Sequence, residues 1–183
     1  MRAGPSPSIW TAPRRHGFQE AGAPWNEAEA QTLLEEFLAD YIQNIAEFSR
    51  PYDGVIATLE RLAARGAILC VATNKRTDLS VALIAALDMT RHFAVICGPD
   101  LVSARKPDGA HIREAVQMSG GDPQRAIMIG DGAPDVQAAR SAGVPSVVVS
   151  FGYTPIPAQD LGGDVLVDHF DEVEAAIDGL IAG

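Results

Sequence analysis

The sequence predicts an α/β protein in which a parallel sheet is covered by helices on both faces. Five short apolar runs, rich in valine and isoleucine, follow one another after residue 66, and segments with helical spacing separate most of them. A helix that joins two parallel strands must pack back on the sheet, so this alternation favours a sheet covered on both sides. With 183 residues, 47% of them hydrophobic, the chain suits one globular domain with a sizeable core.

Ordered structure is expected to begin with a long amphipathic helix after Trp25. Asn26 is a candidate N-cap, and Glu29 stands three residues later, as in a capping box. Most of the residues before this helix are expected to be irregular, because prolines and glycines interrupt them without a sustained period. The residues expected on one apolar face of the helix are Ala30, Leu33, Leu34, Phe37, Leu38, Tyr41, Ile42 and Ile45.

The rest of the chain alternates between helices and strands. A helix over residues 55–66 stops at Gly66 and leads into a strand over 67–73. In parallel sheets, ligands bind beyond the carboxyl ends of the strands, so the residues that follow each strand are the candidates for function. The further strands are predicted at 93–97, 126–130, 146–150 and 164–167, and the further helices at 78–87, 108–119, 134–142 and 171–181.

Composition excludes several classes of function. A net charge of −10 works against binding to nucleic acid, because few cations are available to neutralise backbone phosphates. No apolar run is long enough to span a membrane, and the N-terminus has no apolar core of a secretory signal. Cys70 and Cys97 lie inside apolar runs and are expected to be free thiols of a reducing compartment, which points to the cytoplasm. Signatures of nucleoside triphosphatases, dehydrogenases and serine hydrolases are absent from the sequence.

Polar side chains follow three of the predicted strands. Thr73 and Asn74 come after the first strand, Lys106 lies in the loop after the second, and Asp131 and Asp135 follow the third. A bound phosphoryl group needs hydroxyl or amide donors, a cation, and usually a Mg²⁺ ion held by one or two carboxylates. The combination therefore favours a site for a phosphoryl group and Mg²⁺.

Each of these residues also has a simpler interpretation. Thr73 and Asn74 can form an ordinary turn at a strand end. Lys106, which precedes a proline, can be a solvated loop lysine, and Asp131 can cap the following helix. Their joint order along one sheet favours the phosphoryl site over three separate coincidences.

The motifs "VATNK", "RKPDG" and "IGDGAPD", followed by "AARSAGVPSVVVSFGY", occur in an order that resembles the phosphoglycolate phosphatase branch of the haloacid dehalogenase superfamily. The resemblance extends from about Gly17 to the C-terminus. It implies a Rossmann-like core sheet, a small helical cap and a Mg²⁺-dependent phosphomonoesterase activity. It also implies that Thr73 binds the phosphoryl group with Asn74 beside it, that Lys106 stabilises the charge, and that Asp131, supported by Asp135, binds Mg²⁺.

The chain departs from that family at its first strand. Members of the family begin with a DxDGT-type motif, whose first aspartate attacks phosphorus and whose second acts as a general acid and base. This chain has no aspartate before Asp40 and no D-x-D sequence anywhere. Because covalent catalysis requires the nucleophile, an inactive or truncated form is expected. The missing strand is central in the family, so its absence predicts two strands with unpaired backbone groups and an open groove between them.

The predicted organisation has three parts, and two functions remain open. Residues 1–16 are expected to be irregular, residues 17–50 to form a partial helical cap, and residues 51–183 to form the α/β core without its first strand. The first function is hydrolysis of a small phosphorylated metabolite, with 2-phosphoglycolate favoured. The second is a non-catalytic domain that binds a phosphate-containing ligand or a protein partner through the same pocket. The sequence leaves the exact ester and the oligomeric state open.

Overall fold

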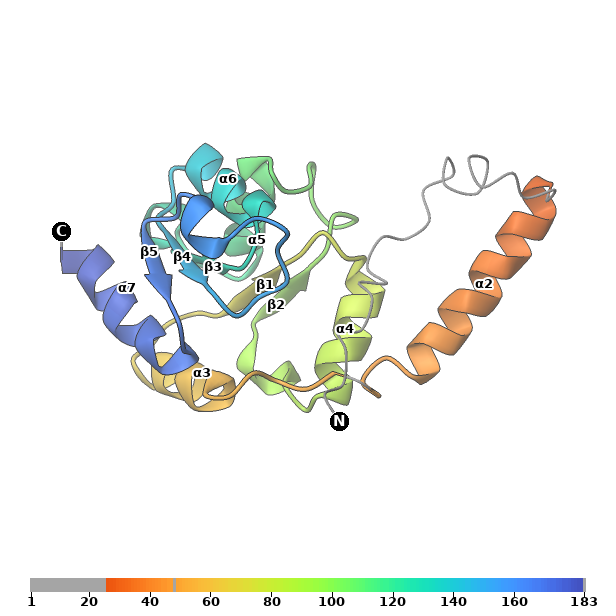
Figure 1. The fold of residues 1–183 in the computed structure, drawn as a ribbon, viewed down its shortest axis with the longest axis horizontal. Coiled ribbons are helices and arrows are strands. Elements are labelled where there is room, and N and C mark those ends of the chain that lie inside the picture. The colour runs from red at the N-terminus through yellow and green to blue at the C-terminus, as the bar shows by residue number, and fades with distance from the viewer. Residues whose placement is uncertain (1–25, 48, 183) are drawn as a thin grey trace. The chain divides into compact units, whose positions relative to one another are not determined.

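The computed structural model describes residues 26–47 and 49–182 (Figure 1). The chain divides into two compact units, residues 1–43 and residues 44–183. The segment 1–16, expected to be irregular, lies outside the described residues, and so do residues 17–25 and 48 of the expected partial cap.

The first unit contains the helix α2 (Glu27–Gln43), which begins as the sequence predicts. The side-chain oxygen of Asn26 accepts hydrogen bonds from the backbone N–H groups of Ala28 and Glu29, each at 3.0 Å. The carboxylate of Glu29 in turn accepts the N–H of Asn26 at 2.8 Å, which completes a capping box. The helix ends earlier than expected, because residues 44–47 form turns instead of a further helical turn.

The second unit has the predicted alternation of strands and helices. Each strand is shorter than the apolar run that predicts it, because only part of the run forms a hydrogen-bonded ladder with a neighbour. Short 3₁₀ helices lie at Thr90–His92, Pro123–Arg125, Ala158–Asp160 and Phe170–Glu172. The main elements are α3 (Val55–Ala64), β1 (Cys70–Ala72), α4 (Thr77–Ala86), β2 (Val95–Cys97), α5 (Gly109–Met118), β3 (Met128–Gly130), α6 (Ala133–Ala142), β4 (Ser146–Val149), β5 (Val165–Val167) and α7 (Val173–Ala182).

The strands are parallel, as predicted, and they form two sheets that are separated where the sequence predicts a missing strand. β1 pairs with β2 in one sheet, and β3, β4 and β5 form the other in that order. Among the described residues, no strand joins β1 to β3. All four residues of β4 are buried, because this strand has a neighbour on each side, whereas every residue of β1 and β3 is only half-buried. The two strands on either side of the predicted gap are therefore incompletely covered by the described residues.

Helices cover both faces of the sheet formed by β3, β4 and β5, as predicted. On one face, Ile112 of α5 packs with Ala138 and Ala139 of α6 and with Met128 of β3. On the other face, Val147 of β4 packs with Val167 of β5 and Val173 of α7. α5 and α6 approach closely, since a Cβ atom added at Gly109 would lie 2.4 Å from the backbone nitrogen of Ala142. These two apolar layers form the core that supports the ends of β3 and β4.

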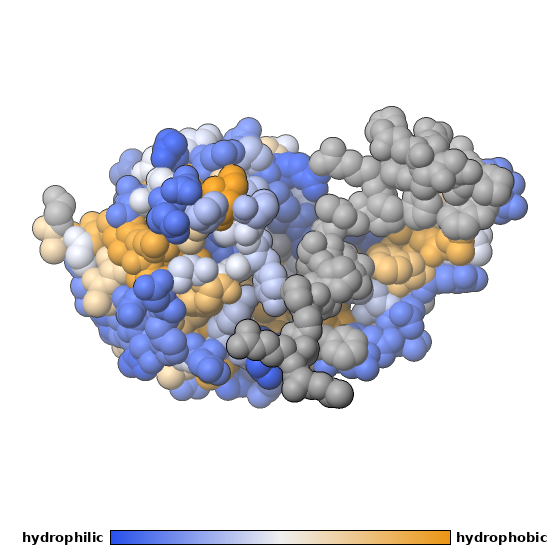
Figure 2. All heavy atoms as spheres, viewed as in Figure 1, coloured by the Kyte–Doolittle hydropathy of each residue, from blue (hydrophilic) through white to orange (hydrophobic). Residues whose placement is uncertain are grey.

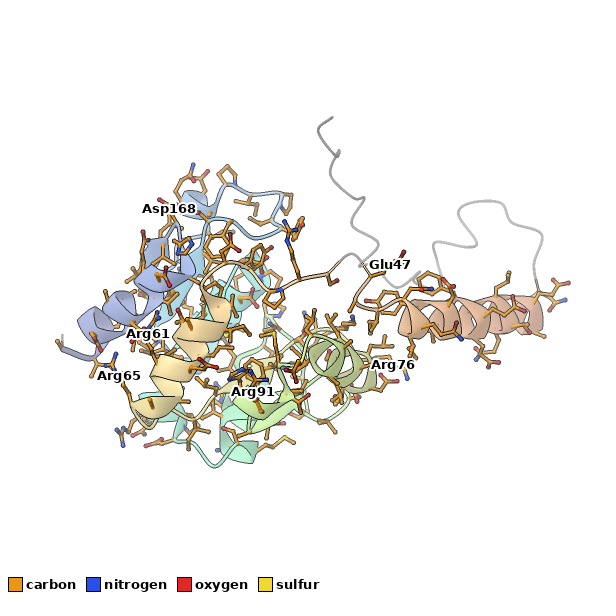
Figure 3. The ribbon with its side chains drawn as sticks, turned by 90° about the horizontal axis from the view of Figure 1, so that it is seen from below. Glu47, Arg61, Arg65, Arg76, Arg91 and Asp168 are labelled. Carbon is orange, nitrogen blue, oxygen red and sulfur yellow. The ribbon has the colours of Figure 1, made fainter. Side chains whose placement is uncertain are left out.

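Polar contacts hold α3 against α7 at the surface. The guanidinium group of Arg61 pairs with Glu174, and that of Arg65 pairs with Asp178. Both arginines extend from α3 on the side where α7 lies (Figure 3). Hydrophobic residues also gather on the surface over β5 and α7 (Figure 2). Leu166 of β5 is 43% exposed and Ile181 of α7 is 72% exposed.

Cys70 and Cys97 are free thiols, as predicted. Burial raises the pKa of both thiols, so they are protonated at neutral pH and have little nucleophilic character. In the part of the chain that the structure describes, none of the helices has the length and apolar character that a membrane span requires.

Candidate active site

The predicted site residues meet where β1 and β3 end. Thr73 directly follows β1, and Asp131 directly follows β3. Lys106 comes from the loop between β2 and α5, and Asp135 lies in the first turn of α6. The ends of two separate sheets are therefore connected by side chains at this point.

Lys106 is a buried residue of the site and not a solvated loop lysine. Its Nζ donates a hydrogen bond to Asp135 Oδ1 at 2.6 Å and another to the backbone oxygen of Ala72 at 2.5 Å. Its side chain is only 8% exposed, and that of Asp135 is 12% exposed. A lysine ammonium has three N–H donors, so one donor remains for a bound anion.

Asp135 organises the loop that carries Asp131. Its Oδ2 accepts the backbone N–H groups of Asp131 at 3.2 Å and of Gly132 at 3.1 Å, while its Oδ1 is held by Lys106. The side chain fits closely beside Gly130, where an added Cβ atom would lie 2.5 Å from the Cβ of Asp135. Asp135 therefore caps the start of α6, a role for which the sequence made Asp131 the candidate.

The carboxylate of Asp131 is turned away from α6 and toward the segment that follows β4. Its Oδ2 accepts the backbone N–H of Tyr153 at 2.8 Å. Its Oδ1 has no hydrogen-bond donor among the residues that the structure describes. Because a carboxylate oxygen carries two lone-pair sites and negative charge, Asp131 Oδ1 is available to a hard cation.

Thr73 and Asn74 form the turn that the simpler interpretation predicts, and they also connect to the site. The Oγ1 of Thr73 accepts the backbone N–H of Lys75 at 3.1 Å, which leaves its O–H without an acceptor among the described residues. The side-chain N–H of Asn74 donates to the backbone oxygen of Lys106 at 2.8 Å. Asn74 thereby holds the loop that carries Lys106, and its own buried Oδ1 has no partner in the described part of the chain.

The sequence model of the haloacid dehalogenase-like hydrolase family matches residues 10–149, which is well over half of the chain. The chain belongs to this family. It is 46% identical over 160 residues to the phosphoglycolate phosphatase of Caulobacter vibrioides, covering 87% of this chain and 68% of that protein. It is also 34% identical over 161 residues to the N-acetylmuramic acid 6-phosphate phosphatase of Pseudomonas aeruginosa, covering 86% of this chain and 70% of the relative.

Solved structures of haloacid dehalogenase-like proteins share the fold. The crystal structure of a predicted phosphoglycolate phosphatase from Haemophilus somnus superimposes with a TM-score of 0.79 at 29% identity. The match covers 88% of this chain and 72% of that protein. The α/β architecture with parallel strands and covering helices is thus the architecture of the family.

The carboxylates of this haloacid dehalogenase-like chain fit a Mg²⁺ ion that keeps most of its water ligands. The described residues contain no group of three or more His, Cys, Asp or Glu side chains that could enclose a metal. Mg²⁺ is commonly held by one or two carboxylates and several waters, so a dedicated cage is not required. Asp131 Oδ1 is the oxygen best placed to bind the ion, while Asp135 already shares both oxygens with Lys106 and the backbone.

Two residues beside the site were given no role by the sequence analysis. Lys75 follows the turn after β1, and burial lowers its pKa from the usual value to about 8. His111 of α5 is fully buried, and neither ring nitrogen has a hydrogen-bond partner with good geometry among the described residues. Burial and the nearby charge of Lys106 lower the pKa of His111, although the backbone at Cys97 and Ala104 acts weakly in the opposite direction. Neither environment could be inferred from spacing, since both depend on residues distant in sequence.

Proposed function

We propose that this chain carries the phosphoryl-binding and Mg²⁺-binding part of a phosphoglycolate phosphatase site. The observation that carries the proposal is the buried Lys106, whose ammonium group is fixed by Asp135 and Ala72 and has one donor left. A small phosphomonoester is the ligand that this site suits. The relatives named phosphoglycolate phosphatase make 2-phosphoglycolate the favoured member of that class.

Each residue of the site would make a different contact with the bound phosphoryl group or with the Mg²⁺ ion. Lys106 would donate its remaining N–H to a phosphoryl oxygen, and Thr73 would donate its hydroxyl hydrogen to a second one. Asp131 would hold Mg²⁺, which supplies positive charge next to the phosphoryl oxygens when it is bound. Asp135 would keep Lys106 oriented, because its Oδ1 accepts a hydrogen bond from the buried ammonium group.

Hydrolysis needs an attacking group in addition to these binding groups. The family attacks phosphorus with the first aspartate of a D-x-D sequence, and no D-x-D occurs in this chain. We therefore expect the 183-residue chain to bind a phosphorylated ligand without turning it over at a rate typical of the family. The free thiols Cys70 and Cys97 favour a reducing compartment such as the cytoplasm as the place where it acts.

Calorimetry tests binding and phosphate release tests turnover. Inorganic phosphate and 2-phosphoglycolate are titrated into the chain with and without Mg²⁺, and released phosphate is measured in parallel. We expect Mg²⁺-dependent binding that Lys106→Met and Asp131→Asn each weaken at least about tenfold. Asp160→Asn, which changes an exposed aspartate of the 3₁₀ helix Ala158–Asp160, is the matched control and should bind as the unchanged chain does.

Two outcomes would contradict the proposal. Absence of any binding in a chain that circular dichroism shows to be folded would remove the phosphoryl site. Phosphate release that Asp131→Asn abolishes would show that another residue of this chain performs the attack. A different phosphomonoester, N-acetylmuramic acid 6-phosphate, is tested as a ligand as well, because one relative carries the name of that phosphatase. Tighter binding of this sugar than of 2-phosphoglycolate would favour it as the ligand.

A further inference from the structure

The segment Phe151–Tyr153, which follows β4 after Ser150, lies against Asp131. β3 and β4 are parallel neighbours, with Gly130 opposite Val148 in the register, so the residues that follow the two strands emerge side by side. Asp131 begins the loop after β3, and Phe151 to Tyr153 lie at the start of the loop after β4, next to Ser150. This adjacency brings the backbone N–H of Tyr153 into hydrogen-bond contact with the side chain of Asp131, 22 residues earlier in the sequence.

Gly152 is required by the space that Asp131 occupies. A Cβ atom added at Gly152 would lie 2.0 Å from the Cβ of Asp131 and 2.4 Å from its Oδ2. Both distances are far below van der Waals contact, so a side chain at position 152 would displace Asp131. The backbone of Gly152 does not have a left-handed φ angle, so an L-residue could adopt its conformation. The reason for glycine at this position is therefore contact with the aspartate and not the shape of the turn.

The contact from Tyr153 comes from its backbone. Its N–H donates to Asp131 Oδ2 at 2.8 Å, whereas its side chain is 83% exposed. The hydrogen bond occupies one carboxylate oxygen and fixes the direction in which the other points. A carboxylate held in this way loses little further freedom when it binds a cation.

Phe151 fixes this segment to the core. Its ring packs edge-on against Tyr52, with 5.0 Å between ring centroids, and tilted against Phe170 at 5.7 Å. It also packs on the apolar cluster that contains Val147 and Val167. The N–H of Tyr153 is therefore presented by backbone that is anchored two residues away.

We propose that Gly152 and the backbone N–H of Tyr153 are the positioning residues for Asp131, and that this turn sets the cation affinity of the site. Gly152 leaves room for the aspartate side chain, and the N–H of Tyr153 holds Oδ2 so that Oδ1 faces the cation. The inference rests on the proposed function, in that Asp131 is taken as the ligand of a divalent cation. It concerns residues to which the motifs in the sequence assigned no role.

Binding of Mn²⁺ tests the inference independently of turnover. Mn²⁺ uses the same oxygen ligands as Mg²⁺, and its free concentration is measured by electron paramagnetic resonance. We expect Gly152→Ala to weaken Mn²⁺ binding by about 10- to 100-fold, as changes to groups that orient a metal ligand commonly do. Gly179→Ala in α7 is the matched control, because an added Cβ atom there meets nothing within 4 Å.

A second pair of variants separates backbone from side chain at position 153. Tyr153→Pro removes the N–H and should weaken Mn²⁺ binding to a similar degree as Gly152→Ala. Tyr153→Ala keeps the N–H and removes only the exposed ring, so its Mn²⁺ affinity should stay within about twofold of the unchanged chain. Circular dichroism melting checks that each variant is folded before its affinity is compared.

The outcomes distinguish this inference from the proposed function. If the unchanged chain and Asp131→Asn bind Mn²⁺ equally, Asp131 is not the cation ligand and both fail. If Asp131→Asn abolishes binding but Gly152→Ala and Tyr153→Pro bind normally, only the positioning role is overturned. Should both of these variants unfold, the amide resonance of Tyr153 in the unchanged chain decides. A shift on adding Mg²⁺ that clearly exceeds the shift at Gly179 supports the role, and an unmoved resonance overturns it.

Discussion

The ammonium group of Lys106 lies 2.6 Å from Asp135 Oδ1, and both side chains are almost fully buried. This ion pair joins the loop after β2 to the start of α6, and a further hydrogen bond from Lys106 reaches the last residue of β1. No described strand connects β1 to β3, so these side-chain contacts link elements of the two sheets where backbone pairing does not.

Removing one member of this pair should destabilise the protein strongly. Lys106→Met leaves the Asp135 carboxylate buried without its cation, and Asp135→Asn leaves the ammonium group without its anion. Each change should lower the free energy of unfolding by about 3–5 kcal/mol, measured by urea denaturation. Arg76→Met, which breaks an exposed pair with Asp78, is the control and should cost less than about 1 kcal/mol.

The double variant of Lys106 and Asp135 measures how the two charges interact. Lys106→Met combined with Asp135→Asn removes both charges, so its loss of stability should be smaller than the sum of the two single losses. Strictly additive losses would mean that the two groups act independently, in contradiction to their contact.

Acid should destabilise the protein in part through His111. This buried residue lies near the positive charge of Lys106, which lowers its pKa, and the carboxylate of Glu114 acts weakly in the opposite direction. The net effect is a pKa below the usual value of 6.5 in the folded protein. As the pH falls below about 6.5, the unfolded chain binds a proton that the folded chain resists, so stability is lost.

Chemical denaturation at pH 7.5 and pH 5.5 measures this contribution. The unchanged protein should lose more stability over this interval than His111→Gln, by at most about 1.4 kcal/mol per pH unit. An equal pH dependence of the two proteins would show that His111 takes up its proton as easily in the folded as in the unfolded state.

The side-chain amine of Lys75 should titrate with a pKa of about 8, well below that of an exposed lysine. Burial lowers its pKa to about 8 in the folded protein, against 10.5 for an exposed lysine. The unfolded chain therefore binds more protons between these two values, and the contribution of Lys75 to stability should rise as the pH increases from about 8 to about 10.5. Lys75 and Lys106 are the only lysines in the sequence, so isotope-edited NMR of lysine Cε can follow each. A midpoint above pH 10 for Lys75 would contradict the burial that the structure shows.

Hydrogen exchange should differ between alternate residues of the strands next to the gap. The N–H of Thr73 donates to the backbone oxygen of Cys97 in β2, and the N–H of Met128 donates to that of Pro145, just before β4. Successive residues of a parallel strand point their backbone groups to opposite edges, so the N–H groups of Ala72 and Ile129 point to the edges without a described partner. We expect Ala72 and Ile129 to exchange much faster than Thr73 and Met128. The amides of Val147 and Val148 in β4 should be among the slowest. Equal protection of Ala72 and Thr73 would mean that the open edge of β1 is paired.

Local sequence patterns were sufficient for the elements and for placing the candidate site residues after the strands. The capping box at Asn26 and the stop at Gly66 depend on neighbouring residues, so they can be read from short stretches of sequence. Thr73, Lys106 and Asp131 come after successive strands in the sequence. The rule that the carboxyl ends of parallel strands lie at one edge then predicts that these residues gather there. Family membership followed from the same ordered motifs and is shown by the match to the family.

The sequence determined which side chains gather at the strand ends, but only the tertiary structure decided what each one does there. Asp135, and not Asp131, caps α6, because Lys106 and two backbone N–H groups converge on Asp135. Asp131 is instead held by Tyr153, 22 residues later in the chain. The strand order within each sheet, β1-β2 and β3-β4-β5, likewise depends on contacts between strands that are distant in sequence. The physical reason is range: helix caps and strand patterns arise from contacts between near neighbours, whereas burial, ion pairing and carboxylate orientation arise from contacts across the fold.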